Sequence, residues 1–404
     1  MNIGVSERLE PILLAAKEFV EKEVKPLDEE YLAEVAIGDR WQLTDRQTEI
    51  IEGLKAKARE RGLWNFFLTD HNGGAGLNTV EYAYIAEITG SSHLAPEAMN
   101  CSAPDTGNME VLAKYGSDAQ KKQWLEPLLA GKIRSAFAMT EPDVASSDAT
   151  NISMSAVLEG DEWVLNGEKT YISGAGDPRC KILICMVKTD PDNAAHQQQS
   201  QILVPMGVDG LEVLRPMMVF NEDDAPHGHM HLRFTNVRVP KENMILGRGR
   251  GFEISQGRLG PGRIHHCMRA IGVAEKALEL LCKRATSRTA FGKPLAQLGG
   301  NFDIIADARI SIDMARLLTL QTAYMIDNED PKAAREWISK IKVYVPNMAL
   351  KIIDESIQMH GAYGISQDFE LASMYMGART LRLADGPDAV HRRQVARAEL
   401  KKYR

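Results

Sequence analysis

The sequence predicts an α+β protein in which a β domain lies between two helical domains. Hydrophobic residues at helical spacing dominate residues 1–134 and again residues 247–404, whereas short alternating segments fill residues 135–246. We therefore expect an N-terminal α-helical domain, a middle antiparallel β-barrel or sandwich domain, and a C-terminal four-helix bundle, with those boundaries.

Capping signals mark helix starts in the first domain. Thr44 with Gln47, and Ser117 with Gln120, each match a capping box, in which the two side chains satisfy each other's main-chain N–H groups. Apolar residues at helical spacing follow both boxes. A helix is expected to begin just after Thr44 and another just after Ser117.

Alternation and turn residues characterise the middle domain. Residues 152–174 alternate, with turns expected at residues 159–161 and at Asn166-Gly167. The short strands that follow are not separated by long helices, so antiparallel pairing is expected. The polar run at residues 196–200 is expected to be a surface loop.

The C-terminal domain contains four long segments with helical periodicity, followed by a short final helix. The segments lie near residues 252–286, 301–328, 332–360 and 367–382. Arg258, in the first of them, is expected to be a solvated arginine rather than a ligand for a substrate anion.

A tight loop with the sequence RLADGPDAVHR, residues 382–392, precedes the final helix. Asp388 is expected to be the N-cap of that helix, Pro387 suits the turn before it, and Gly386 permits an unusual backbone angle. Capping thus explains three residues of the loop and leaves Asp385 without a structural role.

Bulk composition excludes several classes of protein. The 404 residues are 44% hydrophobic and 25% charged, as in ordinary globular proteins, and the net charge of −7 argues against a nucleic-acid binder. No apolar run is long enough to span a membrane. The N-terminus resembles neither a signal nor a transit peptide, and the five cysteines include no CxxC pair. A reducing, cytoplasmic location is expected.

Histidines alternate in the stretch HGHMH. On a strand, His227, His229 and His231 would share one face, where they could bind a metal. No fourth ligand is fixed by the sequence, and alternating histidines also suit a half-exposed strand. We therefore expect no metal site.

Glycines recur in GRGRGFEISQG, which begins at Gly247 and superficially suggests a dinucleotide-binding loop. The strand–turn–helix unit that such a loop requires is missing. We expect these glycines to ease the chain from the β domain into the helical bundle.

Two further stretches combine groups that suit a ligand. Residues 138–150, AMTEPDVASSDAT, could be turn chemistry or could direct hydroxyl and N–H groups into a cleft. In RTAFGKPL, Arg288 could stabilise a helix C-terminus or bind a phosphate, and Phe291 could offer an aromatic face to a base.

These stretches together resemble the acyl-CoA dehydrogenase family over nearly the whole chain. The shared elements occur in family order at fitting intervals: AMTEP with a following serine, Gly167–Ser173, Arg288 with Phe291-Gly292, Gln358–Gly361 and Asp385-Gly386. The resemblance implies non-covalently bound FAD, αβ-desaturation of an acyl-CoA thioester and transfer of electrons to an electron-transfer flavoprotein. It also implies a homotetramer built as a dimer of dimers, or a homodimer, with FAD near a subunit interface.

The resemblance also implies roles for individual residues of the β domain. Met139 and Thr140 would contact the flavin ring, and Ser146 would reach the FAD pyrophosphate or the pantetheine arm of the substrate. Tyr171 would provide an aromatic surface beside the flavin, and the hydroxyl of Ser173 would lie near flavin N5.

In the helical part, Arg288, Phe291 and Gln358 would contact the FAD of a neighbouring subunit. Arg263 matches an arginine associated with the CoA end of the substrate, and Gly386 would also lie at the substrate. Three departures from the family pattern put single FAD contacts in doubt: Gly299, Ala362 and Pro387.

The carboxylate of Asp385 is expected to be the catalytic base. Most members of the family have glutamate here, and aspartate is one methylene, about 1.5 Å, shorter. A branch of the family with a near-identical ADGPD-x-VH stretch also carries aspartate. Other relatives place the base next to Arg263, where this chain has Gly262 and so cannot supply it.

Two alternatives remain open from the sequence. The first is a flavin oxidase on the same scaffold: nitroalkane oxidases also use an aspartate at this position, whereas an acyl-CoA oxidase would usually be longer. A non-catalytic acyl-CoA- or flavin-binding protein is disfavoured, because the chain retains a carboxylate at residue 385 and hydroxyls at residues 140 and 173.

Overall fold

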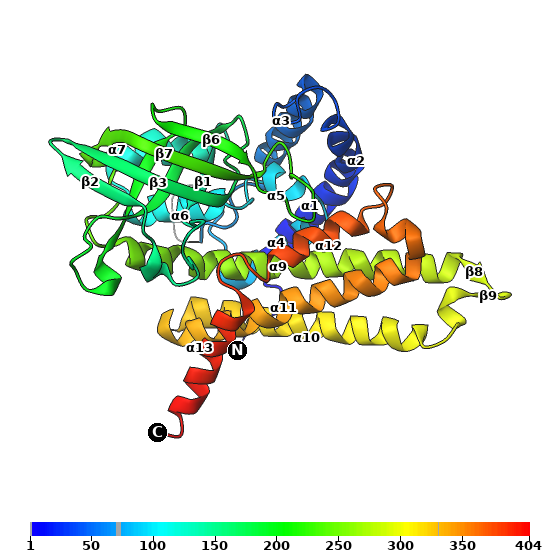
Figure 1. Ribbon diagram of the computed structural model, residues 1–404. Coiled ribbons are helices and arrows are strands. Elements are labelled where there is room, and N and C mark those ends of the chain that lie inside the picture. The colour runs from blue at the N-terminus through cyan, green and yellow to red at the C-terminus, as the bar shows by residue number, and fades with distance from the viewer. Residues whose placement is uncertain (1, 70–73, 330) are drawn as a thin grey trace. The chain divides into compact units, whose positions relative to one another are not determined.

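The computed structural model describes residues 2–69, 74–329 and 331–404. The chain forms two compact units, each assembled from separated stretches (Figure 1). Unit 1 consists of Met1–Lys25, Gly76–Pro96 and Arg263–Arg404, and unit 2 consists of Pro26–Ala75 and Glu97–Gly262. Along the chain, the predicted order of helical, β and helical regions is confirmed, whereas the exact domain boundaries stay a prediction.

Helices dominate the chain up to residue 129. They are α1 (Leu9–Phe19), α2 (Lys25–Glu34), α3 (Asp45–Glu60), α4 (Thr79–Thr89), α5 (Ala95–Ala98), α6 (Asp105–Tyr115), α7 (Asp118–Gln120) and α8 (Glu126–Leu129), with π-helical turns at Val20–Val24 and Lys121–Leu125. Both predicted capping boxes are present. The Oγ1 atom of Thr44 accepts from the Gln47 N–H over 3.0 Å, and Ser117 pairs with Gln120 in the same way.

A seven-stranded sheet forms the middle of the chain. Its strands are β1 (Arg134–Ala138), β2 (Ser155–Glu159), β3 (Glu162–Ser173), β4 (Cys180–Lys188), β5 (Gln199–Pro205), β6 (Leu211–Pro216) and β7 (His229–Pro240). The order is β1-β4-β2-β3-β7-β6, and β5 pairs with β4. Most pairs are antiparallel as predicted, but β4 is parallel to both β1 and β2, which corrects the prediction of a purely antiparallel domain.

Two local predictions in this region are wrong. Asn166-Gly167 is not a turn but lies inside β3, where the register with β7 shifts between Leu165 and Gly167. Gly167 has a φ of +144°, and a Cβ there would come within 2.8 Å of Met154. The run at residues 196–200 is not wholly a surface loop, because its last two residues begin β5 and are buried.

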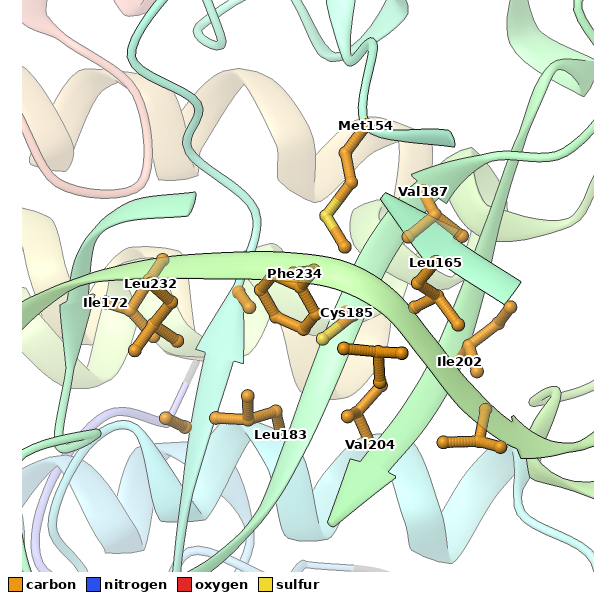
Figure 2. Packing of buried hydrophobic residues seen from close by; sticks show 14 of the residues in the cluster. Met154, Leu165, Ile172, Leu183, Cys185, Val187, Ile202, Val204, Leu232 and Phe234 are labelled. Carbon is orange, nitrogen blue, oxygen red and sulfur yellow. The ribbon is translucent and has the colours of Figure 1, made fainter. Parts of the chain in front are cut away.

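Apolar side chains from the strands form the core of unit 2. Leu165 and Ile172 of β3, Cys185 of β4, and Leu232 and Phe234 of β7 are buried together (Figure 2). Strands β1, β4, β5 and β7 contribute alternate residues to this layer, so burial of the core favours one register of these strands. The loop ends that carry the candidate cofactor residues are therefore attached to a rigid support.

The C-terminal part of the chain is helical and gives the four predicted long segments and the final helix. Its elements are α9 (Gly251–Ser287), the two-stranded hairpin β8 (Thr289–Ala290) and β9 (Lys293–Pro294), α10 (Asn301–Asn328), α11 (Pro331–His360), α12 (Leu371–Thr380) and α13 (Asp388–Lys401). Within unit 1, α11 packs against α10, α12 and α13, and the hairpin lies at one end of α9 and α10 (Figure 1). None of the described helices is long and apolar enough to cross a membrane.

Helices α4 and α9 approach each other closely in unit 1 because both carry glycine at the contact. A Cβ at Gly90 would lie 2.0 Å from the carbonyl oxygen of Arg269, and one at Gly272 would lie 1.9 Å from that of Glu87. Glycine is therefore required at both positions. This contact fixes the part of α9 that carries Arg263 and His266.

Candidate active site

The loop between α12 and α13 places Asp385 on a left-handed backbone. Its φ is +56° and that of Gly386 is +104°, so two consecutive residues adopt conformations that side chains disfavour. A Cβ at Gly386 would also lie 3.0 Å from Nε2 of His391. The side chain of Asp385 is only 17% exposed. The loop thus holds a sheltered carboxylate in a conformation that a neighbouring glycine makes possible.

Two side chains, one from a helix before the loop and one from the helix after it, hydrogen-bond to the main-chain carbonyl of Asp385. Arg263 of α9 donates from Nε to the Asp385 carbonyl oxygen over 2.9 Å, and His391 of α13 approaches the same oxygen with Nε2 at 3.3 Å. A carbonyl oxygen can only accept, so Nε2 of His391 carries the hydrogen and the Ser339 hydroxyl, 3.4 Å from Nδ1, is the donor there. Burial lowers the pKa of His391 to about 4, and the charges of Arg263 and Lys342 act in the same direction.

Three side chains of unit 1 interact with the carboxylate of Asp385: those of His266, Lys342 and Arg263. Nε2 of His266 lies 3.5 Å from its Oδ2. Lys342 is buried and donates to the carbonyl of Leu381. Burial lowers the pKa of both Arg263 and Lys342, and the negative charge of Asp385 opposes this effect in each. The arrangement can keep an ionised carboxylate in a largely dehydrated place.

Asp388 does not cap the final helix as predicted. Pro387 occupies the N-cap position, and Asp388 is the first helical residue, with no side-chain capping bond at the N-cap. Its Oδ2 accepts from Nε of Arg382 over 2.9 Å and from Asn347 over 3.1 Å. Burial raises the pKa of Asp388, but these two hydrogen bonds outweigh it, so its pKa lies below the usual value. Asp388 therefore links the loop between α12 and α13 to α11, through Asn347, instead of capping the start of α13.

In unit 2, a buried lysine organises the loop after β1. Nζ of Lys169 donates to the carbonyl oxygens of Met139 and Met186, over 3.0 and 2.6 Å, and to Oε1 of Glu141 over 2.8 Å. Glu141 in turn accepts from the main chain and hydroxyl of Ser153. Burial raises the pKa of Glu141, but the charge of Lys169 and these hydrogen bonds lower it overall. Sequence analysis missed Lys169, although an interior lysine on an alternating strand is itself a signal.

The predicted cofactor residues of this unit are brought together. The Thr170 N–H donates to the carbonyl of Thr140 over 2.8 Å, so the segment after β1 lies against the end of β3. Tyr171 sits on a bulge with a φ of +55°, and 52% of its side chain is exposed. Ser146 accepts from the Glu141 N–H over 2.9 Å and shapes the same loop.

An exposed aromatic face beside a hydroxyl and ordered main chain suits a flat heteroaromatic ring with polar edges. Tyr171, Ser173 and the segment of Met139 and Thr140 supply those groups in unit 2. The residues present therefore fit the flavin that the sequence predicts, and their individual roles stay predictions.

Three histidines that the sequence singled out have separate partners. His229 Nδ1 lies 2.7 Å from the Ser173 hydroxyl, and His231 Nε2 lies 2.7 Å from the Glu168 carboxylate. His227 precedes β7 and does not share the strand face. Burial and the nearby charge of Arg134 lower the pKa of His227. Among the described residues, no group of histidine, cysteine and acidic side chains could hold a metal ion.

The remaining predicted residues differ in exposure. Phe291 lies at the hairpin between β8 and β9 and is 96% exposed, and Arg288 and Gln358 are also exposed.

The prediction of a solvated Arg258 is wrong. Its side chain is buried, its guanidinium lies 3.9 Å over the ring of Phe137, and Nε donates to Asn108.

Comparisons with known proteins agree with this architecture. The chain matches, in order, the acyl-CoA dehydrogenase N-terminal domain over residues 6–132, the middle domain over 136–237 and the C-terminal domain over 249–400. A solved structure of an acyl-CoA dehydrogenase candidate from Mycobacterium abscessus is 51% identical and superimposes with a TM-score of 0.96. That alignment covers 99% of this chain and 100% of the other.

Two curated relatives are also similar to nearly the whole chain. Acyl-CoA dehydrogenase family member 10 of Mus musculus is 52% identical, and family member 11 of Gallus gallus is 51% identical, each over 98% of this chain. The chain spans only 37% and 51% of the lengths of these relatives. The fold and the three consecutive domain matches define the class as that of acyl-CoA dehydrogenase-like proteins, and the chain belongs to the acyl-CoA dehydrogenase family.

Proposed function

We propose that this protein catalyses the α,β-desaturation of an acyl-CoA thioester with FAD as cofactor and Asp385 as the base. The observation that carries the proposal is the sheltered carboxylate of Asp385, on a loop whose main chain is held by Arg263 and His391. Membership of the acyl-CoA dehydrogenase family supports the same reaction.

The protein's own residues must make an α C–H bond acidic enough to break. Asp385 removes the α proton, and its side chain is largely shielded from water, which would otherwise compete for the carboxylate. A positioned general base contributes about 10²- to 10⁴-fold to rate. The hydrogen bonds to the Asp385 carbonyl restrict where the carboxylate can lie, which is the condition for that contribution. FAD, when bound, supplies the acceptor for the hydride that leaves the β carbon.

The proposed cofactor and substrate contacts follow the predicted residues. Met139, Thr140, Ser146, Tyr171 and Ser173 would hold the flavin and pyrophosphate, supported by the hydrogen bonds of Lys169 to Met139 and of Thr170 to Thr140. Arg263 and Gly386 are assigned to the substrate.

The exposed Arg288, Phe291 and Gln358 are assigned to FAD of a neighbouring subunit in a homodimer or homotetramer, supported by the exposure of Phe291. An electron-transfer flavoprotein is the proposed electron acceptor. A reducing compartment such as the cytoplasm is supported by the five free thiols.

Anaerobic titration of the FAD-loaded protein with a panel of acyl-CoAs tests the reaction. A dehydrogenase bleaches the flavin absorbance with one or more thioesters and releases no peroxide in air when an acceptor is present. Peroxide formation in step with substrate loss would instead establish the flavin oxidase that the sequence left open, which the comparisons do not favour.

The base is tested by Asp385→Asn, which keeps the size of the side chain and removes its basicity. We expect wild-type FAD content and thermal midpoint, with bleaching at least 10²-fold slower than in the wild type. Asp388→Asn is the matched control from the same loop and should retain far more of the rate. Bleaching by Asp385→Asn within a few-fold of the wild-type rate would remove Asp385 from its assigned role.

A further inference from the structure

One of the predicted cofactor residues of unit 2, Ser173, is hydrogen-bonded to a histidine, His229, that has no role in the proposed mechanism. Ser173 and His229 are directly paired residues of β3 and β7. Directly opposite residues of an antiparallel pair project from the same face, and here Ser173 Oγ and His229 Nδ1 are 2.7 Å apart. The hydroxyl is therefore held by a residue 56 positions away in sequence.

The half-exposed carboxylate of Asp224 favours one direction for this hydrogen bond. Its Oδ2 lies 3.6 Å from Nε2, the other ring nitrogen of His229. A carboxylate beside Nε2 favours the hydrogen on that nitrogen, which leaves Nδ1 as an acceptor. The Ser173 hydroxyl then donates to His229, and only its lone pairs remain available to a ligand.

Hydrogen bonds and an ion pair within unit 2 hold the loop that carries Asp224. The Gly228 N–H donates to the carbonyl of Asp224 over 2.7 Å, and the neighbouring Asp223 forms an ion pair with Arg40 at 2.6 Å. The end of β3 is fastened to the same loop, since the Gly174 N–H donates to the carbonyl of Gly228 over 3.0 Å. The main chain that carries these three side chains is thus held together by hydrogen bonds between the end of β3 and the loop before β7.

We propose that His229, oriented by Asp224, is a positioning residue that fixes the Ser173 hydroxyl as a hydrogen-bond acceptor toward N5 of bound flavin. The inference rests on the proposed function, in which Ser173 holds the flavin, and on the family resemblance, which implies that its hydroxyl lies near N5. Flavin N5 bears a hydrogen only in the reduced cofactor, whereas in the oxidised cofactor it has a lone pair. An accepting hydroxyl therefore stabilises the reduced form, and a hydroxyl free to rotate would donate to the oxidised form instead.

Reduction potentials of the FAD-loaded protein test this device without any substrate. Slow reduction at pH 8 in the presence of a reference dye gives the equilibrium constant for reduction, that is, the ratio of reduced to oxidised cofactor at a given potential. His229→Leu, which cannot accept, should lower that constant at least tenfold, or about 30 mV for a two-electron couple. His229→Asn, whose side-chain oxygen can replace Nδ1 as the acceptor, should stay within about threefold of the wild type.

A double-mutant cycle shows whether His229 acts through the hydroxyl. In a Ser173→Ala background, His229→Leu should change the constant less than twofold, because no hydroxyl remains to be oriented. His231→Gln is the matched control, since His231 lies on the same strand with its own carboxylate partner, Glu168, and should leave the potential unchanged. FAD content and the flavin spectrum of each variant show that it is folded and loaded.

Outcomes for this inference and for the proposed function separate cleanly. An unchanged potential in FAD-loaded His229→Leu, or an equal shift with and without Ser173, overturns the role of His229. Failure of every acyl-CoA to bleach the loaded wild type overturns the proposed reaction but leaves the potential measurement decisive for His229. A wild-type protein that takes up no FAD overturns both.

Discussion

Nε2 of His391 donates a hydrogen bond to the main-chain carbonyl of Asp385 over 3.3 Å, and Arg263 donates to the same oxygen over 2.9 Å. These donors belong to α13 and α9, two helices that are packed within unit 1. A loop residue therefore takes its position from rigid elements on either side. This arrangement suits a catalytic group, because loops alone hold side chains less firmly than helices do.

Acid should weaken the protein through His391. Burial lowers the pKa of its imidazole to about 4, whereas an unfolded chain titrates near 6.5. Between these values the unfolded state binds more protons, so the free energy of unfolding falls as the pH is lowered from about 6.5 to about 4. The variant His391→Gln does not lose stability in this way, because glutamine does not titrate. The stability advantage of the wild type over this variant, measured by thermal unfolding at each pH, should therefore shrink across that window.

The exposed His196 supplies the control for this experiment. His196→Gln should follow the wild-type curve across the same pH range. A difference between wild type and His391→Gln that stays constant from pH 7 to pH 4 would show that His391 is not held neutral.

A second titration effect of opposite sign is expected at Glu110 on α6. Burial raises the pKa of its carboxyl to about 8, although the positive charges of Arg258 and Lys114 oppose this, and its Oε2 has no hydrogen-bond partner among the described residues. From about pH 4.5 to 8 the folded state binds more protons than the unfolded state, so wild-type stability falls as the pH rises.

Glu110→Gln imitates the neutral acid and escapes that loss. The variant should match the wild type near pH 4.5 and exceed it by on the order of 4 kcal/mol at pH 8. Denaturant unfolding at several pH values measures the difference. A variant that is less stable than the wild type at pH 8 would mean that the ionised carboxylate is needed in the fold.

Local signals in the sequence predicted local structure well. The capping boxes of Thr44 and Ser117 formed because their hydrogen bonds span only three residues. Asn166-Gly167 has the composition of a hairpin turn, yet the pairing of β3 with β7 made it part of a strand. Local composition could not reveal this, because the partner strand lies some 70 residues further on.

Motifs in the sequence suggested candidate site residues, whose roles stay predictions, but they could not reveal contacts between distant residues. The DGPD loop pointed to Asp385, but the roles of Asp388 and His229 depend on partners 41 and 56 residues away. Asp388 was misassigned by a single position, since Pro387 takes the N-cap. Burial of Arg258 also required the tertiary contact with Phe137, which composition does not encode.

Replacing Lys169 by methionine should damage unit 2 severely. The ammonium group is fully buried and pairs with Glu141, so its loss leaves an uncompensated carboxylate in the interior. Breaking a buried pair in this way costs about 3–5 kcal/mol. We expect a lower thermal midpoint and loss of FAD from Lys169→Met.

Two companion variants isolate the cause. Lys169→Met combined with Glu141→Gln should recover part of the stability, because the second change removes the stranded charge. Lys181→Met, at an exposed lysine of β4, should be nearly neutral. No recovery in the double variant would show that the carbonyl contacts of Lys169, rather than the charge pair, dominate.

Phe291 should affect cofactor retention without affecting the stability of the chain. Its side chain is 96% exposed, so Phe291→Ala removes little packing within a subunit and should change stability by less than about 0.5 kcal/mol. If the ring covers FAD of a neighbouring subunit, affinity for FAD should fall roughly three- to tenfold. Tyr403→Ala, another exposed aromatic, is the control. Unaltered FAD binding in Phe291→Ala assemblies would exclude the proposed contact.

Lys169 connects three strands, and this has a consequence for how the protein becomes active. One ammonium group joins the carbonyl after β1 to a carbonyl within β4, while its own backbone belongs to β3. The loop proposed to hold the flavin can take its shape only after these three strands have assembled. During refolding in the presence of FAD, the change in flavin absorbance and fluorescence on binding would therefore mark the completion of the sheet, and a chain arrested before that step would bind no FAD however large the excess.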